Sequence, residues 1–407
     1  MGFSESEIER IRDDFPILKN GVGGKPIVYF DSACMSLKPK QVVHAMDEYY
    51  EKYPACAGRS MHKLGRMVND KVAEARKTVA KFLGAKTAGE VVFTRNTTEG
   101  INLVANSLDL KKGDVVMTTD REHNSNLLPW QLLSKRRGVE HRVIRSKEDM
   151  EFDLEQFDGM IDEKVKLVSV VHTSNLDGYT LPAEKIVKIA HEHEALVMLD
   201  GAQSAPHKQI DVRKLDVDFF ALSGHKMLGP TGTGVLYGRY ELLEDMEPFM
   251  IGGDTVQSST YDSHVLLKPP EKFEAGLQNY AGEIGLGEAA RYLEKIGRER
   301  IEKHETKLNR LISERLLQMG GVSIIGPENA ELRGGIVSFN MRGLEHHDIA
   351  GMLDESNIMV RSGQHCVHSW FNSHKIPGCV RASLYLYNTT DEAEKFLDAV
   401  AEISKLR

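Results

Sequence analysis

The sequence has few cysteines and no CxxC pair. Four occur among 407 residues, at Cys34, Cys56, Cys366 and Cys379. This usage excludes a disulfide framework and is typical of proteins in a reducing compartment. We therefore expect a cytoplasmic protein.

Long apolar runs and an excess of positive charge are also absent. No run of about eighteen apolar residues occurs, and the acidic N-terminal stretch lacks the apolar segment of a signal peptide. Lys and Arg number 52 against 60 Asp and Glu, which gives a net charge of −8. We therefore expect neither a membrane nor a nucleic acid as a partner.

Short apolar runs alternate with helical patterns along the first two thirds of the chain. Strands are predicted at 91–94, 115–119, 139–144, 167–171, 196–199 and 219–222, with helices at 97–108, 124–137 and 182–194. This alternation predicts an α/β fold with a mainly parallel sheet covered on both faces. A long helix over 286–319 then leads into a small α+β domain. We predict an N-terminal arm at 1–25 that packs on the small domain, a large domain at 26–285 and the small domain at 286–407.

Two neighbouring buried strands end in residues that favour one cofactor chemistry. Asp200 ends the first strand, and Lys226 follows the second in a Ser-Gly-His-Lys turn. A lysine can hold pyridoxal phosphate as a Schiff base, and an acid can keep the pyridine nitrogen protonated. The alternative is a surface lysine in a turn and an aspartate that caps a helix.

Other polar residues follow the ends of the predicted strands. His123, Asn175, Asp200 and Lys226 come after four different strands, and ligands of parallel α/β sheets bind beyond those carboxyl ends. His123 is placed to stack on a planar ring, whereas Asn175 and Gln203 suit a phenolic oxygen. Each of these residues has a purely structural alternative.

A helix predicted to begin at Thr97-Thr98 offers a phosphate site. Free amides at a helix N-terminus bind anions, and Ser223 and His225 are candidates to donate to the same phosphate. An ordinary threonine N-cap is the alternative. The glycine run 229–234 matches neither a P-loop nor a dinucleotide motif.

A second centre lies near the C-terminus, in Arg361-Ser-Gly-Gln-His-Cys366-Val-His368. A cysteine beside histidines and an arginine is expected to be a thiolate of lowered pKa, and hence a nucleophile. A zinc site of His365, Cys366, His368 and His374, or a plain loop thiol, are the alternatives. Arg381, at the start of a later strand, suits a substrate carboxylate.

These motifs resemble the group II (Suf-type) cysteine desulfurases, within the fold-type I, class V aminotransferase superfamily. The resemblance runs in order along nearly the whole chain, through stretches 29–33, 96–105, 122–126, 129–131, 200–203, 223–226, 229–232, 273–276, 361–366, 381–384 and 387–389. It implies a sheet of seven strands sandwiched by helices in the large domain, and a smaller C-terminal α+β domain that carries the cysteine loop.

The resemblance also implies roles around pyridoxal 5'-phosphate. Lys226 holds the cofactor as an aldimine and then moves the substrate Cα proton, Asp200 pairs with the pyridine nitrogen, and His123 stacks on the ring. Gln203 and Asn175 address the ring oxygen. The phosphate is held by Thr98, Ser223 and His225, with Thr97 beside them.

For the substrate, the resemblance implies L-cysteine as the sulfur donor. Arg381, with Arg361, binds its carboxylate, and Cys366 attacks its sulfur to become a persulfide, which releases alanine. The sulfur then goes to iron–sulfur cluster assembly, through a sulfur-acceptor or scaffold protein. The family is a homodimer in which the partner chain completes each site, and no metal is expected.

The sequence departs from the family pattern at three places. Leu277-Gln278 replaces a usual Thr-Pro, Gln364 replaces a histidine, and Arg59-Ser-Met-His62 replaces a His-Arg-Gly-Ile-His-like stretch. Leucine cannot donate a hydrogen bond, so we expect a weakened phosphate contact across the dimer. The alternative functions are a selenocysteine lyase, another class V reaction such as transamination or epimerisation, and a non-catalytic sulfur-carrier or scaffold protein.

Overall fold

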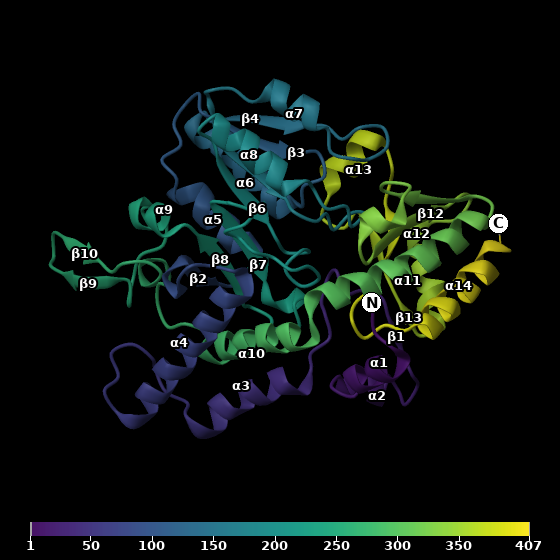
Figure 1. Ribbon diagram of the computed structural model, residues 1–407, viewed down its shortest axis with the longest axis horizontal. Helices are drawn as coiled ribbons and strands as arrows, with labels where there is room; N and C mark the ends of the chain where they lie inside the picture. Colours follow the sequence, from purple (N-terminus) through teal and green to yellow (C-terminus); the bar gives the residue numbers. More distant parts are fainter. Residues whose placement is uncertain (1, 407) are drawn as a thin grey trace.

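A seven-stranded sheet lies at the centre of the larger part of the molecule (Figure 1). The structure is a computed structural model that describes residues 2–406. The strand order is β2-β8-β7-β6-β5-β3-β4. The bounds are β2 Val91–Thr94, β3 Val115–Thr119, β4 Glu140–Ile144, β5 Val165–Val171, β6 Leu196–Asp200, β7 Phe219–Ser223 and β8 Gly234–Gly238. Only β8 runs antiparallel to its neighbours within this described sheet, so the predicted mainly parallel α/β fold is confirmed.

Apolar side chains cover both faces of this sheet. Val115 and Met117 on β3 belong to one hydrophobic cluster, whereas Val116 between them belongs to another. Successive residues of a strand point to opposite faces, so a strand buried on both faces has a continuous apolar run. The covering helices are α3 Lys40–Lys52, α4 Lys63–Leu83, α5 Thr97–Ser107, α6 Asn124–Arg137, α7 Leu154–Met160, α8 Ala183–Glu192, α9 Tyr240–Asp245 and α10 Tyr280–Ile296.

The single long helix predicted over 286–319 is wrong. Two helices, α10 and α11 Arg298–Gln318, meet at Gly297, whose φ of 92° ends the first helix. Helix α10 packs on α3 and α4, whereas α11 packs on the C-terminal helix α14 Thr390–Ser404.

A four-stranded antiparallel sheet forms the smaller part of the fold. Its order is β11-β12-β15-β14, and Phe339 and Phe396 pack beneath it. The bounds are β11 Val322–Ile325, β12 Ile336–Met341, β14 Arg361–Gly363 and β15 Cys379–Ser383, with helices α12 His346–Glu355 and α13 His368–His374.

The N-terminal segment contacts this smaller part. Strand β1 Val28–Tyr29 pairs in parallel with β13 Ile358–Met359. In the preceding helices, α1 Glu5–Arg12 and α2 Pro16–Asn20, Arg12 forms an ion pair of 2.7 Å with Glu392. The domain division stays a prediction, and these partners favour a boundary at Gly297 with β1 assigned to the small domain.

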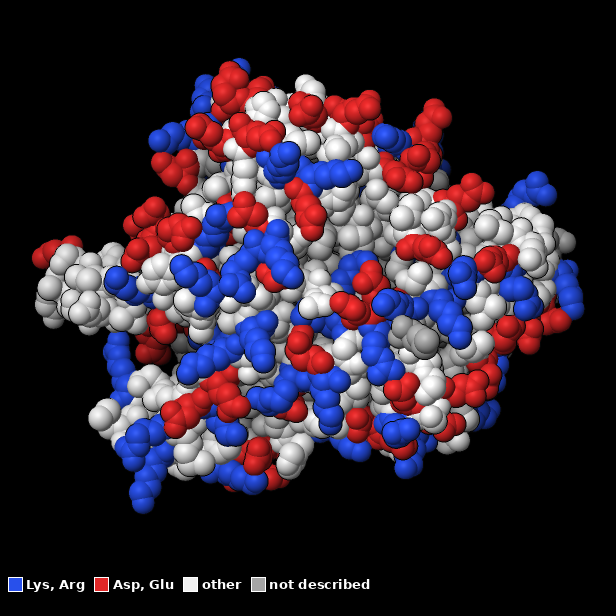
Figure 2. Space-filling view, in the orientation of Figure 1, with Lys and Arg blue, Asp and Glu red and all other residues white. Residues whose placement is uncertain are grey.

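A hairpin projects from the large domain, at the left of Figure 1. It consists of β9 Val256–Ser259 and β10 His264–Leu266, and short 3-10 turns occur at η1 Ala88–Glu90, η2 Gly224–Lys226, η3 Glu271–Phe273 and η4 Ala330–Arg333. Among the helices that the structure describes, none has the length and hydropathy needed to cross a membrane. On the face that Figure 2 shows, acidic and basic side chains are interspersed.

A buried ion pair fixes the loop after β5, which carries Asn175. Arg121 Nη1 lies 2.9 Å from Asp177 Oδ2, and these side chains are 2% and 0% exposed. Arg121 also donates to Ser146 Oγ at 2.6 Å. The pair therefore joins the loops that follow β3, β4 and β5.

We expect Asp177→Ala to lower the free energy of unfolding by about 3–5 kcal/mol, because Arg121 would stay buried without its counterion. Urea unfolding followed by circular dichroism measures this change. Asp109→Ala is the matched control, since Asp109 pairs with Lys111 at the exposed surface. Equal unfolding midpoints for the two variants would contradict the prediction.

Candidate active site

A cavity of about 430 Å³ lies at the carboxyl ends of the central strands. Its walls come from the loops after β1, β3, β5, β6 and β7 and from the cysteine loop of the small domain. Every site residue predicted from the sequence lines this cavity: Thr97, Thr98, His123, Asn175, Asp200, Gln203, Ser223, His225, Lys226, Arg361, Cys366 and Arg381. The structure thus brings the whole predicted set together, while the role of each residue stays a prediction.

Lys226 and Asp200 influence each other within this cavity. Burial lowers the pKa of Lys226, and the Asp200 carboxylate opposes that shift. Burial likewise raises the pKa of Asp200, against the effect of Lys226. Asp200 Oδ1 also accepts a hydrogen bond of 3.0 Å from the Ala202 amide. A buried carboxylate of this kind is stabilised by a cation placed next to it.

The first turn of α5 and the turn before Lys226 form a polar cradle. Ser223 Oγ accepts from the Thr97 amide at 2.9 Å and lies 2.7 Å from Thr97 Oγ1. Thr98 Oγ1 lies 2.7 Å from Ser125 Oγ. The hydroxyls therefore face one another at a helix N-terminus, which is an arrangement that binds an anion.

His123 caps the N-terminus of α6 and is held as a neutral ring. Its Nδ1 accepts from the Ser125 amide at 3.1 Å. Burial, followed by the charges of Lys226 and Arg381, lowers the pKa of His123 to about 3. A neutral imidazole at the cavity wall is suited to stack on a planar ring.

The side-chain amides of Asn175 and Gln203 each donate one hydrogen bond to a backbone carbonyl. Asn175 Nδ2 donates to the His365 carbonyl at 2.7 Å, and Gln203 Nε2 donates to the Ala33 carbonyl at 2.7 Å. Their carbonyl oxygens, Asn175 Oδ1 and Gln203 Oε1, are buried without a hydrogen-bond partner in the described part of the chain. The second N–H of each amide remains for a ligand oxygen, and each carbonyl for a ligand donor. The contact of these amides with a ring oxygen stays a prediction.

The two predicted carboxylate-binding arginines share an acid that the sequence interpretation missed. Arg361 Nε and Nη2 donate to Asp31, at 3.0 and 2.7 Å, and Arg381 Nη2 lies 3.7 Å from it. Arg381 Nη1 donates to the Asn175 carbonyl at 3.0 Å, and its buried Nε lacks a partner among residues 2–406. Asp31 follows β1, more than three hundred residues from these arginines, so their pairing has no local signature.

Cys366 lies in a strained loop between β14 and α13. His365 and Cys366 have φ of 48° and 60°, a region that side chains of this size rarely occupy. The Asn124 amide donates to the Cys366 carbonyl at 2.8 Å, and Asn175 holds the His365 carbonyl. Loops of the large domain therefore hold the exposed thiol at the cavity.

The two histidines beside Cys366 in the chain direct ring nitrogens to other partners, and the predicted activation of this thiol stays a prediction. His365 Nε2 faces Cys379 Sγ at 3.2 Å, and burial near Arg381 and Arg361 lowers the pKa of His365 to about 2. His368 Nδ1 lies 2.9 Å from Asn124 Nδ2. Lys226 lies within electrostatic range of Cys366.

The zinc alternative does not fit this arrangement. Across residues 2–406, no three His, Cys, Asp or Glu side chains gather as metal ligands. His365 faces Cys379, and His374 stacks on Trp370 with 4.1 Å between ring centroids.

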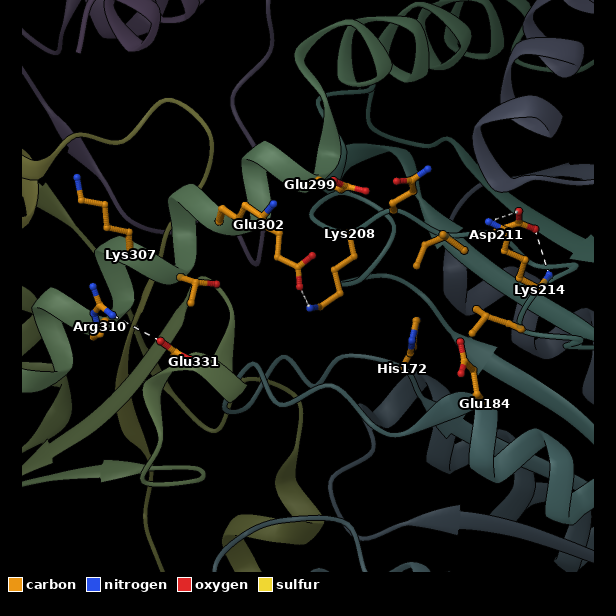
Figure 3. Close-up of a pocket in the computed structure, with 15 residues that line it drawn as sticks. His172, Glu184, Lys208, Asp211, Lys214, Glu299, Glu302, Lys307, Arg310 and Glu331 are labelled. Atoms are coloured by element: carbon orange, nitrogen blue, oxygen red, sulfur yellow. Dashed lines mark hydrogen bonds and ion pairs between the residues drawn. The ribbon is translucent and has the colours of Figure 1, made fainter. Parts of the chain in front are cut away.

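A larger cavity of about 1010 Å³ lies between α11 and the segment 207–215 (Figure 3). Six of its charged side chains form three ion pairs: Lys208 with Glu302, Lys214 with Asp211 and Arg310 with Glu331. It contains none of the predicted site residues, so we place the functional site at the smaller cavity.

Further residues at the smaller cavity were missed from the sequence. They are Asn96, Ser125, Thr173 and Cys34. Asn96 and Ser125 lie inside the matched stretches 96–105 and 122–126, and Cys34 directly follows the stretch 29–33. Thr173 lies outside the matched stretches.

Comparisons with known proteins agree along the whole chain. The family model for aminotransferase class V matches residues 28–396. A probable cysteine desulfurase of Halalkalibacterium halodurans is 42% identical over 396 residues, with 96% of each chain covered. The apo cysteine desulfurase of Thermococcus onnurineus NA1 is 42% identical, with a TM-score of 0.94 and 100% of both chains covered. The cysteine desulfurase CsdA of Escherichia coli is 32% identical, with a TM-score of 0.91 and the same coverage.

The chain belongs to the class V aminotransferase family, among its group II cysteine desulfurases. Pyridoxal phosphate is the cofactor of this family. The cavity of this desulfurase fits the group, because it offers a lysine, a buried acid, a neutral histidine and an anion cradle. The unpartnered buried atoms Asn175 Oδ1, Gln203 Oε1 and Arg381 Nε, counted over the described residues, also indicate that a polar ligand belongs there.

We expect His123 of the cofactor-free desulfurase to stay neutral from pH 7 to about pH 4, because burial disfavours the charged ring and a proton there would also meet Lys226 and Arg381. Ring nitrogen shifts in histidine-labelled protein measure this. Between about pH 6.5 and 3 the unfolded chain binds the extra proton, so this group lowers stability as pH falls, by about 1.4 kcal/mol per pH unit. Lys226→Ala is expected to raise the pKa of His123. A ring that titrates near pH 6.5 in the unmodified chain contradicts the assignment.

Proposed function

We propose that this desulfurase converts L-cysteine to L-alanine and receives the sulfur on Cys366 as a persulfide. The observation that supports this proposal best is that the Cys366 loop and Lys226 line one cavity, although 140 residues separate them in the chain. When bound, pyridoxal phosphate supplies an electron sink for the substrate Cα. Lys226 would hold it, and Asp200 would keep its ring nitrogen protonated.

Lys226 is also the base that moves the Cα proton in this proposal. Burial favours its neutral form, because the pKa of its amine is lowered. His123 is placed to stack on the ring, and Asn175 and Gln203 to address its ring oxygen. The phosphate would lie in the cradle of Thr97, Thr98, Ser223 and His225.

Arg381 and Arg361 would orient the substrate through its carboxylate. Arg381 has an unpartnered buried Nε, counted over residues 2–406, and bidentate binding of carboxylates is the usual task of such a guanidinium. Asp31 would hold the two guanidinium groups in place, because its carboxylate pairs with both the exposed Arg361 and the buried Arg381.

The partners are also proposals. A homodimer is supported by exposed apolar side chains in the segments 58–67 and 250–277: Met61 is 83% exposed, Leu277 74% and Met250 41%. The ion pair of Arg59 with Asp254 connects these segments. We infer that a sulfur-acceptor or scaffold protein takes the sulfur for iron–sulfur cluster assembly, and that the enzyme works in the cytoplasm with free thiols.

A selenocysteine lyase is the second candidate. The exposure of Cys366 supports attack on either chalcogen, and selenide leaves more easily than sulfide. Rates on cysteine and selenocysteine, with and without Cys366, separate the two functions. A keto acid product in place of alanine would instead indicate transamination.

We expect Cys366→Ala to abolish release of alanine from cysteine while leaving the cofactor absorption band unchanged, because the thiol is the nucleophile and contributes nothing to cofactor binding. Alanine detection and the absorption spectrum, measured on the same sample, check both parts.

Cys56→Ala is the control, because Cys56 is exposed and contacts Tyr280 away from the cavity. Desulfuration of cysteine by Cys366→Ala at the rate of the unmodified chain would overturn the persulfide proposal.

We expect Arg381→Gln to raise KM for cysteine by about 10- to 100-fold, the equivalent of a lost hydrogen bond between charged groups. Steady-state kinetics measure the KM and kcat changes separately. Arg310→Gln is the control, since Arg310 forms an exposed pair with Glu331. An unchanged KM in Arg381→Gln would show that the carboxylate binds elsewhere.

A further inference from the structure

The cavity contains a second thiol besides Cys366. Cys34 lines the same cavity from the loop after β1, whereas Cys56 and Cys379 are absent from its described lining. The Cys34 amide donates to the Asp31 carbonyl at 3.1 Å, and the preceding Ala33 carbonyl accepts from Gln203 at 2.7 Å. The backbone on both sides of Cys34 is therefore anchored at the cavity wall.

Charged side chains surround Cys34. Its sulfur lies within electrostatic range of Lys226, Arg361 and Arg381, and Asp31 pairs with both guanidinium groups. The thiolate is the attacking species in exchange at sulfur.

Two buried polar atoms place this wall in the cavity that is proposed to hold the cofactor and the substrate. Gln203, which binds the Ala33 carbonyl, is 3% exposed, and its Oε1 has no partner among the residues that the structure covers. Arg381 is 2% exposed, and its buried Nε likewise has no hydrogen-bond partner among those residues. Cys34 therefore lines the same cavity as these two unpartnered polar atoms.

The two thiols differ in exposure. Cys366 is exposed, whereas Cys34 is half-buried. Sulfur held on Cys34 is therefore better shielded from reductants in solvent than sulfur held on Cys366.

We propose that Cys34 is a second sulfur-bearing thiol, which takes the sulfane sulfur from the Cys366 persulfide and restores Cys366 for another turnover. The step rests on the proposed function, because the Cys366 persulfide is its donor.

The step balances without an added oxidant or reductant. The Cys34 thiolate forms a bond to the outer sulfur of the Cys366 persulfide, and the bond between that sulfur and Cys366 Sγ breaks. The electron pair stays on Cys366 Sγ, which takes up the proton that the Cys34 thiol gave up. One persulfide and one thiol are present before and after.

The test uses the enzyme loaded with pyridoxal phosphate and given excess cysteine without reductant. Free thiols and persulfides are alkylated, and the peptides carrying Cys34 and Cys366 are weighed by mass spectrometry. We expect the mass of one added sulfur atom on both peptides. We also expect the initial burst of alanine to be about twofold larger in the unmodified chain than in Cys34→Ser.

The controls separate the proposed sulfur transfer to Cys34 from the proposed formation of a persulfide on Cys366. Cys56→Ser keeps the larger burst, and Cys366→Ala carries no added sulfur on Cys34. Cys34→Ala serves as a second variant, and cofactor absorption with circular dichroism reports the fold of each. The peptide masses of the unmodified chain decide the question even where a variant misfolds.

Several results would overturn the proposed sulfur transfer from Cys366 to Cys34. One is a Cys34 peptide without added sulfur beside a Cys366 peptide that carries it. Another is an alanine burst in folded Cys34→Ser equal to that of the unmodified chain. A third is added sulfur on Cys34 in Cys366→Ala. A Cys34–Cys366 disulfide with release of hydrosulfide is the competing balanced reaction and also overturns it. Absence of sulfur from both peptides would instead contradict the proposed persulfide function.

Discussion

The electrostatic interaction between the buried amine of Lys226 and the buried carboxylate of Asp200 is the constraint on which this site depends. Burial disfavours the charged form of both side chains, and each offsets part of that effect on the other. The parallel sheet makes the pairing available, because β6 and β7 end at the same edge. His123 then stays neutral beside the positive charges, and polar loops complete the cavity around them.

The cysteine loop and Arg381 of the small domain are held in place by hydrogen bonds with the large domain. Loops of the large domain bind the His365 and Cys366 carbonyls, and the Asn175 carbonyl accepts from Arg381. The parallel pairing of β1 with β13 brings the segment with Asp31 and Cys34 to the same place. The thiol and the guanidinium groups are therefore positioned by contacts between segments far apart in the chain.

The strands were predicted correctly where burial of both sheet faces leaves a continuous apolar run in the sequence. Strands β2 and β3 have the predicted bounds, because continuous apolar runs are the direct consequence of burial on both sheet faces. The helix predicted at 286–319 failed because a single glycine at 297 redirects the chain while the apolar pattern continues. Sequence proximity also says nothing about where a side chain in a loop is directed: His365 is next to Cys366 in the chain but faces Cys379.

The sequence by itself determined the α/β fold, the family and the set of residues that gather at one edge of the sheet, because each depends on strand periodicity or on motifs that lie after strand ends. Only the tertiary structure decided that Asp31 pairs with Arg361 and Arg381, that the thiol loop adopts a left-handed backbone, and that Cys34 shares the cavity with Cys366. These features arise from packing between distant segments, which leaves no period or spacing in the chain.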